Sequence, residues 1–323
     1  MSRAIIVREL GGPEVLKLED REVGAPGPGQ VRLRHEAIGL NFVDVYHRTG
    51  LYKTELPFTP GIEGAGVVTA VGPGVGDFHP GDRVAYAGPM GSYADERLIA
   101  ADKLVRVPDA VDFDTAAAVV SKAGTAHYLL FETWPFKAGD TMLVHAASGG
   151  VGSFLVQWAS SAGATVIALA GTGTKVKGAL ENGARFAFNS REDSWVQKVR
   201  DATGGQGVDV VYDGIGKATF EQSLDCLRPR GLMVSYGNAS GPAPPFTVGE
   251  LVKRGSLFLT RPTMFDYTES RADIEAVARE TFAAVKKGWI KVRIDQRYKL
   301  ADAAQAHRDL EARKTTGASV IVP

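Results

Sequence analysis

The sequence predicts an α/β fold in which a doubly wound parallel sheet follows a smaller, mostly β domain. Three observations predict this. The chain has 323 residues, which favours two domains over one. Its first third is rich in β-type residues and glycine. From about Thr141 onward, short apolar runs alternate with stretches of helical spacing, as in parallel sheets covered by helices.

The first third is expected to form a bent, closely packed β structure. Residues 30–34 alternate polar and apolar side chains, as a half-buried strand does. Residues 61–72 place four glycines around short apolar pairs, a spacing that suits bent strands better than a helix. Residues 81–84 read as a turn that leads into a strand. A small barrel-like domain follows from these patterns.

The middle of the chain is expected to be a βαβ array. The apolar runs at 141–147 and 164–170 flank a glycine turn and a segment, 151–163, with helical spacing. Further apolar runs follow, and they predict more parallel strands at 208–212, 232–236 and 256–260.

The tail returns to mixed structure, with helical periodicity at 274–287 and 301–311 and a final strand at 318–322. This order suggests that the tail completes the first domain. We therefore expect a first domain at 1–124, a nucleotide-binding domain at 125–262 and a return segment at 263–323.

Composition excludes several classes of protein. Lys plus Arg and Asp plus Glu are both 37, so no net charge attracts nucleic acid or a membrane surface. The N-terminus is charged too early for a signal peptide, and no apolar run reaches the length of a membrane span. The single cysteine, Cys226, excludes an internal disulfide. We expect a cytoplasmic protein that binds neither membrane nor nucleic acid.

A candidate phosphate-binding turn joins the first strand of the βαβ array to its helix. It contains Ser148, Gly149, Gly150 and Val151. Glycine lets the backbone approach a pyrophosphate, and the N-terminus of the following helix offers N–H groups and a partial positive charge. A glycine cluster alone is equally typical of a tight turn. Its place in a βαβ unit favours a Rossmann dinucleotide site.

The end of the second strand of this unit indicates NADPH rather than NADH. NADH-binding proteins usually carry an acidic residue there to hold the ribose 2′-hydroxyl. This chain has Gly171, Thr172 and Lys175 instead, which leave room, hydroxyl groups and a positive charge for a 2′-phosphate. Ser190 and Arg191 follow the next short apolar run and are further candidates for the adenosine pocket.

With these motifs, the chain resembles the zinc-free quinone oxidoreductases of the medium-chain dehydrogenase/reductase superfamily. This family includes zeta-crystallin and the bacterial NADPH:quinone reductases. The resemblance spans nearly the whole chain. It is carried by residues 11–16, 39–44 with Tyr46, 50–52, 146–152, 211–213, 223–227, 230–234 and 261–263.

The resemblance implies a Rossmann domain, a GroES-like, mostly β catalytic domain and a cleft between them. It also implies that Asn41, Thr125 and Tyr128 contact the nicotinamide half of the cofactor, with the same cleft lined by Gly237, Asn238 and Arg261. One position departs from the pattern: bacterial reductases often have Tyr where this chain has Ser190. That change removes a ring that would stack near the adenosine.

The zinc ligands of related dehydrogenases are missing. Those enzymes need a Cys near Asn41 and a His in a Gly-His-Glu motif, which reads Gly61-Ile62-Glu63 here. One cysteine cannot form a four-cysteine structural site, and the six histidines lack metal-binding spacing. We expect no metal. A quinone suits this site, because its reduced form is a delocalised, relatively acidic hydroquinone that needs no Lewis acid.

The expected function is hydride transfer from NADPH to a small quinone or conjugated carbonyl. Asn41 is a candidate partner for the nicotinamide ribose or an acceptor oxygen. Tyr46 and Tyr52 either line the acceptor pocket or pack in the barrel wall. Arg261 either places the cofactor or anchors the domain interface. No general acid is identifiable from the sequence.

The sequence leaves two alternative functions open and predicts a homodimer. An enzyme of the same fold that reduces α,β-unsaturated carbonyls or enoyl thioesters needs a proton donor, for which Tyr46 is the candidate. A non-catalytic NADPH-sensing or RNA-binding protein is the alternative from another class, although no RNA-recognition motif is present. The apolar run 256–260 predicts an edge strand that pairs with a second copy in a homodimer, as the resemblance also implies.

Overall fold

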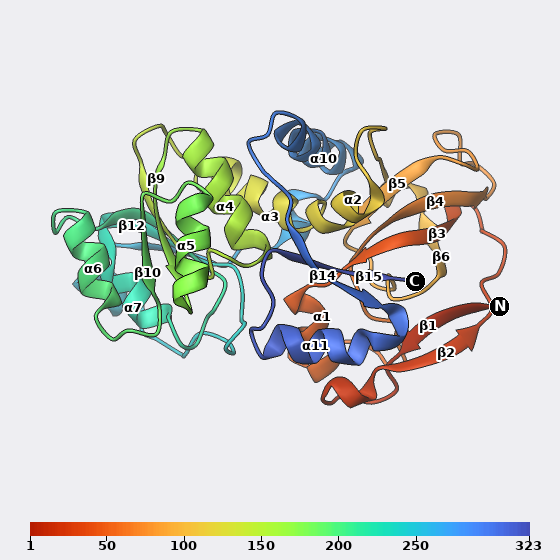
Figure 1. The fold of residues 1–323 in the computed structure, drawn as a ribbon, viewed down its shortest axis with the longest axis horizontal. Coiled ribbons are helices and arrows are strands. Elements are labelled where there is room, and N and C mark those ends of the chain that lie inside the picture. Colours follow the sequence, from red (N-terminus) through yellow and green to blue (C-terminus); the bar gives the residue numbers. More distant parts are fainter. The chain divides into compact units, whose positions relative to one another are not determined.

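The computed structural model describes residues 1–323, which form two compact units (Figure 1). Unit 1 comprises Met1–Gly124, Thr268–Phe282 and Val292–Pro323. Unit 2 comprises Thr125–Tyr267 and Ala283–Lys291. The expected return segment, 263–323, therefore contributes to both units. The assignment of separate catalytic and cofactor-binding roles to these parts of the chain stays a prediction.

Unit 2 contains a six-stranded parallel sheet, as the apolar runs predicted. The strand order is β10-β9-β8-β11-β12-β13, which places β8 and β11 at the centre. Leu143, Ile167 and Val211 are fully buried, because helices cover both faces of such a sheet. The strands are β8 (Thr141–Val144), β9 (Thr165–Ala170), β10 (Phe186–Asn189), β11 (Val208–Asp213), β12 (Leu227–Ser235) and β13 (Phe258–Thr260).

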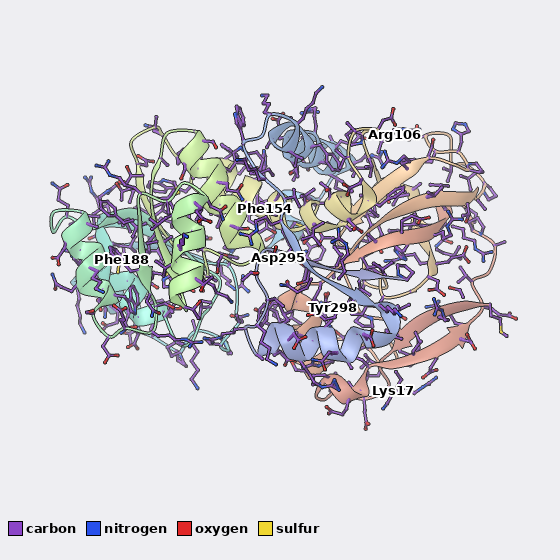
Figure 2. The ribbon with its side chains drawn as sticks, viewed as in Figure 1. Lys17, Arg106, Phe154, Phe188, Asp295 and Tyr298 are labelled. Carbon is purple, nitrogen blue, oxygen red and sulfur yellow. The ribbon has the colours of Figure 1, made fainter.

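The helices of unit 2 cover the sheet with aromatic and aliphatic side chains. Trp195 from α6 and Phe220 from α7 join the core beside Leu143 and Ile167. Phe188 of β10 packs against this core, and Phe154 of α4 is also buried (Figure 2). The helices are α3 (Lys122–Tyr128, which begins in unit 1), η3 (Leu129–Thr133), α4 (Gly150–Ser161), α5 (Gly173–Glu181), α6 (Trp195–Ala202), α7 (Phe220–Asp225), α8 (Gly249–Lys253) and α9 (Met264–Tyr267).

The order of the strands creates a switch point at the carboxyl end of β8. The chain runs outward from β8 to β9 and β10, then returns to β11 on the other side of β8. The loop after β8 is held from both sides, since the His145 N–H donates to the Tyr212 carbonyl and the Ala147 N–H to the Leu169 carbonyl, both at 3.0 Å. Open α/β sheets bind ligands at such points.

Unit 1 is rich in strands, as predicted for the glycine-rich first third, and its strands pair antiparallel except for the parallel pair β14 and β15. Its main sheet has the order β14-β15-β3-β4-β5-β7, with β6 also paired to β3, and β1 and β2 form a separate pair. The C-terminal strand β15 pairs with β3, so the tail belongs to this sheet. The strands are β1 (Ser2–Ile6), β2 (Lys17–Arg21), β3 (Gln30–Gly39), β4 (Glu63–Val71), β5 (Arg83–Ala87), β6 (Glu96–Ala100), β7 (Val105–Arg106), β14 (Ile294–Lys299) and β15 (Ala318–Val322).

The glycines of β4 allow close packing between strands. A Cβ on Gly66 would clash with the carbonyl oxygen of Arg34 on β3, so only glycine fits there. Tyr298 of β14 packs against the core next to α11 and donates its hydroxyl hydrogen to Asp309 at 3.1 Å (Figure 2). The helices are η1 (Pro13–Val15), α1 (Phe42–Thr49), η2 (Ala101–Lys103), α2 (Phe113–Val119), α10 (Arg271–Lys286, which ends in unit 2), η4 (Leu300–Asp302) and α11 (Ala303–Glu311). No helix in the chain combines the length and apolar character needed to cross a membrane.

Candidate functional site

The glycine turn predicted to bind phosphate lies at the switch point of unit 2. Gly149 is the N-cap of α4 and provides no side chain to cap the helix. The first N–H groups of a helix lack intrahelical acceptors, so those of Gly150, Val151 and Gly152 are suited to an anion. A Cβ on Gly152 would clash with the Ala146 carbonyl oxygen, so the tight turn requires glycine. Ser148 lies within the same turn.

The residues predicted to bind a 2′-phosphate gather where β9 and β10 end. Ser190 follows β10, and its N–H donates to the Ala170 carbonyl of β9 at 2.9 Å. Arg191 extends its Nε to 3.6 Å from the position that a Cβ on Gly171 would take. Thr172 is the N-cap of α5 and accepts from the Lys175 N–H at 3.3 Å. No carboxylate occupies the end of β9, and the guanidinium of Arg191 lies beside Gly171 instead.

Two further candidates, Gly237 and Asn238, follow β12. The Gly237 N–H donates to the Asp213 carbonyl at 3.3 Å, and a Cβ on Gly237 would meet the Gly214 carbonyl oxygen at 2.5 Å. Arg261 follows β13, and its Nη1 donates to the Tyr236 carbonyl at 2.8 Å. The parallel sheet therefore brings all the candidates that follow its strands to one edge, the carboxyl edge.

Thr125 and Tyr128 lie on α3, which follows another helix, α2, in the chain and not a strand. The Tyr128 ring is buried and stacks on the Tyr267 ring, with centroids 4.4 Å apart. The Tyr267 hydroxyl in turn accepts a hydrogen bond from Thr133 at 2.9 Å. The orientation of Tyr128 is thus set by a stacked partner that no sequence pattern singles out.

Asn41 lies in unit 1, immediately before α1. Its backbone N–H donates to Asp44 Oδ2 at 2.9 Å, which closes the first turn of the helix. Its side-chain Nδ2 donates to Glu63 Oε2 at 3.0 Å. Glu63 is fully buried and also accepts from Lys122 Nζ at 2.6 Å. Asn41 is therefore held at both its backbone and its side chain.

Tyr46 and Tyr52 meet each other beside α1. Their ring centroids are 5.2 Å apart in an edge-to-face arrangement, and the Tyr52 N–H donates to the Tyr46 carbonyl at 3.0 Å. Tyr46 is buried, whereas Tyr52 is partly exposed. Packing in the wall and lining a pocket are both compatible with this pair, so their part in acceptor binding stays a prediction.

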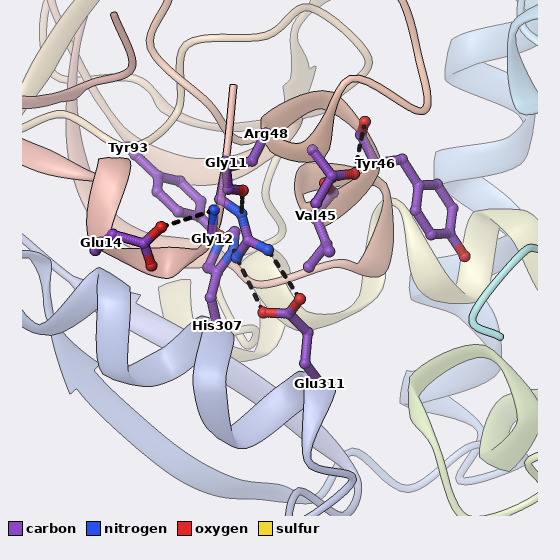
Figure 3. Close-up of polar contacts among 10 residues, drawn as sticks. Gly11, Gly12, Glu14, Val45, Tyr46, Arg48, Tyr93, His307 and Glu311 are labelled. Atoms are coloured by element: carbon purple, nitrogen blue, oxygen red, sulfur yellow. Dashed lines mark hydrogen bonds and ion pairs between the residues drawn. The ribbon is translucent and has the colours of Figure 1, made fainter. Parts of the chain in front are cut away.

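A buried polar network fixes α1, the helix that carries Tyr46 (Figure 3). The Arg48 guanidinium donates to the Gly11 carbonyl at 3.0 Å, to His307 Nδ1 at 3.0 Å and to both carboxylate oxygens of Glu311. Because Arg48 only donates, His307 Nδ1 must accept, and His307 Nε2 carries the hydrogen. That nitrogen donates to the Tyr93 hydroxyl at 3.1 Å.

The network ends at Asp44, which accepts from the Tyr93 hydroxyl at 3.0 Å. Burial raises the pKa of the Asp44 carboxyl to about 7. Burial, and then the Arg48 charge, lower the pKa of His307 to about 3, so His307 stays neutral. Asp44 Oδ1 is buried without a hydrogen-bond partner. A neutral Asp44 is thus favoured near and below neutral pH.

Sequence reasoning missed several residues that support Asn41. The Asn41–Asp44 spacing is a capping signal that could have identified the start of α1. Glu63 was recognised only as the last residue of Gly61-Ile62-Glu63, the motif that lacks the zinc-binding histidine. Lys122, Tyr93 and the Arg48–His307 contact have no sequence signal, because residues far apart in the chain come together only in the folded unit.

Comparisons with known proteins cover the whole chain. Residues 27–109 match the family model described as alcohol dehydrogenase GroES-like domain, and residues 150–281 match that described as zinc-binding dehydrogenase. A quinone oxidoreductase of Pseudomonas aeruginosa is 46% identical over 100% of both chains. The chain belongs to the quinone oxidoreductase family. This family lies within the medium-chain dehydrogenase/reductase superfamily, as the resemblance implied.

Solved structures are similar to this chain over its whole length. The Escherichia coli quinone oxidoreductase complexed with NADPH has a TM-score of 0.98 and 42% identity, covering 100% of both chains. A mycobacterial structure complexed with NADPH has a TM-score of 0.96 and 44% identity, covering 99% of this chain and 100% of the other. A Burkholderia 2-haloacrylate reductase is also similar, at 45% identity over 100% of this chain and 99% of its own. The GroES-like and Rossmann parts of the predicted fold class are thereby confirmed.

The zinc named in one family description has no counterpart among the side chains of this chain. No group of three or more His, Cys, Asp or Glu side chains is arranged to hold a metal ion. Ile62, at the position of the expected histidine, is buried and cannot ligate. The donor set thus does not fit zinc, while the glycine cradle and the cationic end of β9 do fit a dinucleotide phosphate.

Proposed function

We propose that this chain is an NADPH-dependent quinone reductase. The observation that carries the proposal is the end of β9, where Gly171, Lys175 and Arg191 replace the acid that would hold an NADH ribose. Cationic and hydroxyl side chains suit a 2′-phosphate, because charge-assisted hydrogen bonds to phosphate are strong. The family membership and the relatives solved with NADPH support the same cofactor.

Each part of the proposed site has a physical task. The N-terminus of α4 holds the pyrophosphate, and Ser190 and Arg191 border the adenosine phosphate. When bound, NADPH supplies a hydride, and Asn41, Tyr46 and Tyr52 orient the reacting partners and exclude water. Conversion of a quinone to a hydroquinone takes up one further proton, for which water is the proposed source. The residues proposed to surround the nicotinamide half are Thr125, Tyr128, Gly237, Asn238 and Arg261.

The proposed reaction does not use zinc. Asn41 and Ile62 occupy the places where zinc-dependent relatives need ligands. A catalytic zinc site needs three protein ligands drawn from His nitrogen, Cys sulfur and carboxylate oxygen, with water or substrate in the fourth tetrahedral position. Turnover unchanged after dialysis against a chelator, with no zinc in the purified protein by elemental analysis, is the expected result. Loss of turnover that zinc restores would contradict it.

The direct test is a set of initial rates with NADPH or NADH and a quinone such as 1,4-benzoquinone or 9,10-phenanthrenequinone. Rapid loss of nicotinamide absorbance with NADPH, and slow loss with NADH, is expected. Tight NADPH binding with no quinone turnover would reject the acceptor while leaving the cofactor assignment in place.

A second candidate acceptor is an electron-poor carbon–carbon double bond. The similarity to the Burkholderia 2-haloacrylate reductase favours it, since a haloacrylate has its double bond conjugated to a carboxylate. Protonation at the α-carbon then needs a donor, and Tyr46 is the candidate. Turnover of 2-haloacrylate or an enone at rates above those with quinones would favour this acceptor, and a Tyr46→Phe variant should then lose it selectively.

We further propose a cytoplasmic homodimer that binds no nucleic acid. Strand β13 lies at the edge of the unit 2 sheet, and its Phe258 is 59% exposed. Val248, the N-cap of α8, and Val252 within α8 are also exposed, at 76% and 70%. An unpaired strand edge and exposed apolar side chains both favour association with a second copy. Sedimentation at micromolar concentration should give a dimer, and a monomer would reject this assembly.

A further inference from the structure

A buried ion pair in unit 1 holds the side chain of Asn41. Glu63 Oε2 accepts from Asn41 Nδ2 at 3.0 Å and from Lys122 Nζ at 2.6 Å. Glu63 Oε1 accepts from the Ser121 N–H at 2.7 Å. Glu63 is 0% exposed and Lys122 4%. The carboxylate therefore accepts three hydrogen bonds and is shielded from water, and its charge is balanced by one ammonium.

The carboxylate decides which way the Asn41 amide faces. A carboxylate only accepts hydrogen bonds, so the atom of Asn41 beside it must be the amide nitrogen. The same nitrogen lies 3.4 Å from the Gly39 carbonyl oxygen, the acceptor for its second hydrogen. The Asn41 backbone N–H is also engaged, by Asp44. All the N–H groups of Asn41 are thus directed to unit 1. Oδ1 is the acceptor of the capping box with the Asp44 N–H, and its second lone pair is the one that can accept from a ligand.

The packing leaves little freedom for another arrangement. A Cβ on Gly39 would clash with Glu63 Oε2 and with the Ala117 carbonyl oxygen, so glycine is needed for the carboxylate to come this close. Lys122 is needed as well, because a buried carboxylate without a counter-charge is costly.

We propose that Glu63, neutralised by Lys122, is a positioning residue that fixes Asn41 as a hydrogen-bond acceptor for a hydroxyl group. The inference rests on the proposed function and deepens it. A quinone oxygen cannot donate a hydrogen bond, which excludes the quinone itself as the partner, and the hydroxyl that we propose belongs to the nicotinamide ribose or to the hydroquinone product. Asn41 then recognises the cofactor or the reduced acceptor, and does not polarise the quinone.

The test reverses the amide. In a Glu63→Gln, Lys122→Met double variant, both charges are gone and the pair stays close in size. The introduced glutamine amide keeps its oxygen toward the Ser121 N–H and turns its NH2 toward Asn41. Because that NH2 group donates, Asn41 must turn its Oδ1 toward it and present Nδ2 to the ligand. The same pair of substitutions is also made together with Asn41→Ala. Circular dichroism and thermal melting identify folded variants.

Two binding constants are measured for each variant. NADPH Kd comes from nicotinamide fluorescence without an acceptor, and hydroquinone affinity from equilibrium dialysis with NADP⁺. The loss of one neutral hydrogen bond corresponds to roughly a 2- to 10-fold weakening. When Asn41 is present, the double substitution should weaken either NADPH binding or hydroquinone binding by this factor. In the Asn41→Ala background, the double substitution should weaken neither any further. A matched control, Glu96→Gln, removes the carboxylate that pairs with Arg32 at 2.5 Å elsewhere in unit 1 and should leave both constants unchanged.

The outcomes separate the hypotheses. Weaker NADPH binding assigns the hydroxyl to the ribose, and weaker hydroquinone binding alone assigns it to the product; both support the positioning role. An equal loss with and without Asn41, or no loss in either constant, would overturn it. Because the NADPH measurement needs no turnover, a failure of quinone reduction leaves this test intact.

Discussion

Removal of the Lys122 ammonium should destabilise the chain severely. In Lys122→Met, Glu63 stays fully buried and keeps the Ser121 and Asn41 donors, but it loses the cation that contacts it at 2.6 Å. Breaking a buried ion pair by removing one partner costs about 3–5 kcal/mol. For a domain of about 150–250 residues, each kcal/mol lowers Tm by about 2–4 °C, so a decrease of roughly 6–20 °C is expected.

The assay is thermal and urea unfolding of the full chain, followed by circular dichroism. The double variant with Glu63→Gln removes both charges and should recover much of the loss, because no uncompensated charge remains. Lys198→Met is the matched control. It breaks an ion pair with Glu192 in which both side chains are more than 40% exposed, so it should cost less than about 1 kcal/mol. A Lys122→Met loss as small as the control, or a double variant no more stable than Lys122→Met, would refute the reasoning.

Four other outcomes are expected. Lys175→Met should raise the NADPH Kd by roughly 10-fold or more and leave NADH binding unchanged, and an equal effect on both cofactors by titration calorimetry would count against a 2′-phosphate contact. Gly152→Ala should abolish measurable NADPH binding by clashing within the phosphate turn, whereas Gly178→Ala, with open space around the new Cβ, should bind normally. Burial raises the pKa of Asp44 from 3.8 to about 7, so between these values the folded chain holds a proton that the unfolded chain releases. The contribution of Asp44 to the free energy of unfolding is therefore fully present below about pH 4 and is lost as the pH rises toward 7. Asp44→Asn should flatten that part of a urea-unfolding series across pH, and an unchanged slope would show that Asp44 does not titrate there. Phe258→Lys should convert the expected dimer to a monomer in sedimentation, and a retained dimer would place the interface elsewhere.

Much of the fold could be predicted because its signals are local. The apolar runs at 141–147 and 164–170 correspond to β8 and β9 within a few residues, since buried parallel strands need continuous apolar side chains. The glycine-rich stretch at 61–72 corresponds to β4, which packs too closely against β3 for a Cβ at Gly66. The final strand predicted at 318–322 is β15.

The candidate site was less accessible to sequence reasoning. The turn at Gly149 and the end of β9 carry a fingerprint, so they could be proposed from spacing alone. Glu63 and Lys122 could not, because their contact joins residues 59 apart in sequence. Tyr93 and His307 are 214 apart, and their hydrogen bond depends on how α11 packs on unit 1. Pairings of this kind are fixed by tertiary packing, which leaves no periodic trace in the chain.

The most direct test of NADPH-dependent quinone reduction is the initial rate of NADPH oxidation by the purified protein with 9,10-phenanthrenequinone, beside an equal concentration of NADH and a blank without enzyme. We expect rapid turnover with NADPH, a rate with NADH lower by about 10-fold or more at subsaturating cofactor, and little signal in the blank. Equal rates with the two cofactors, or no turnover above the blank, would contradict the proposed function.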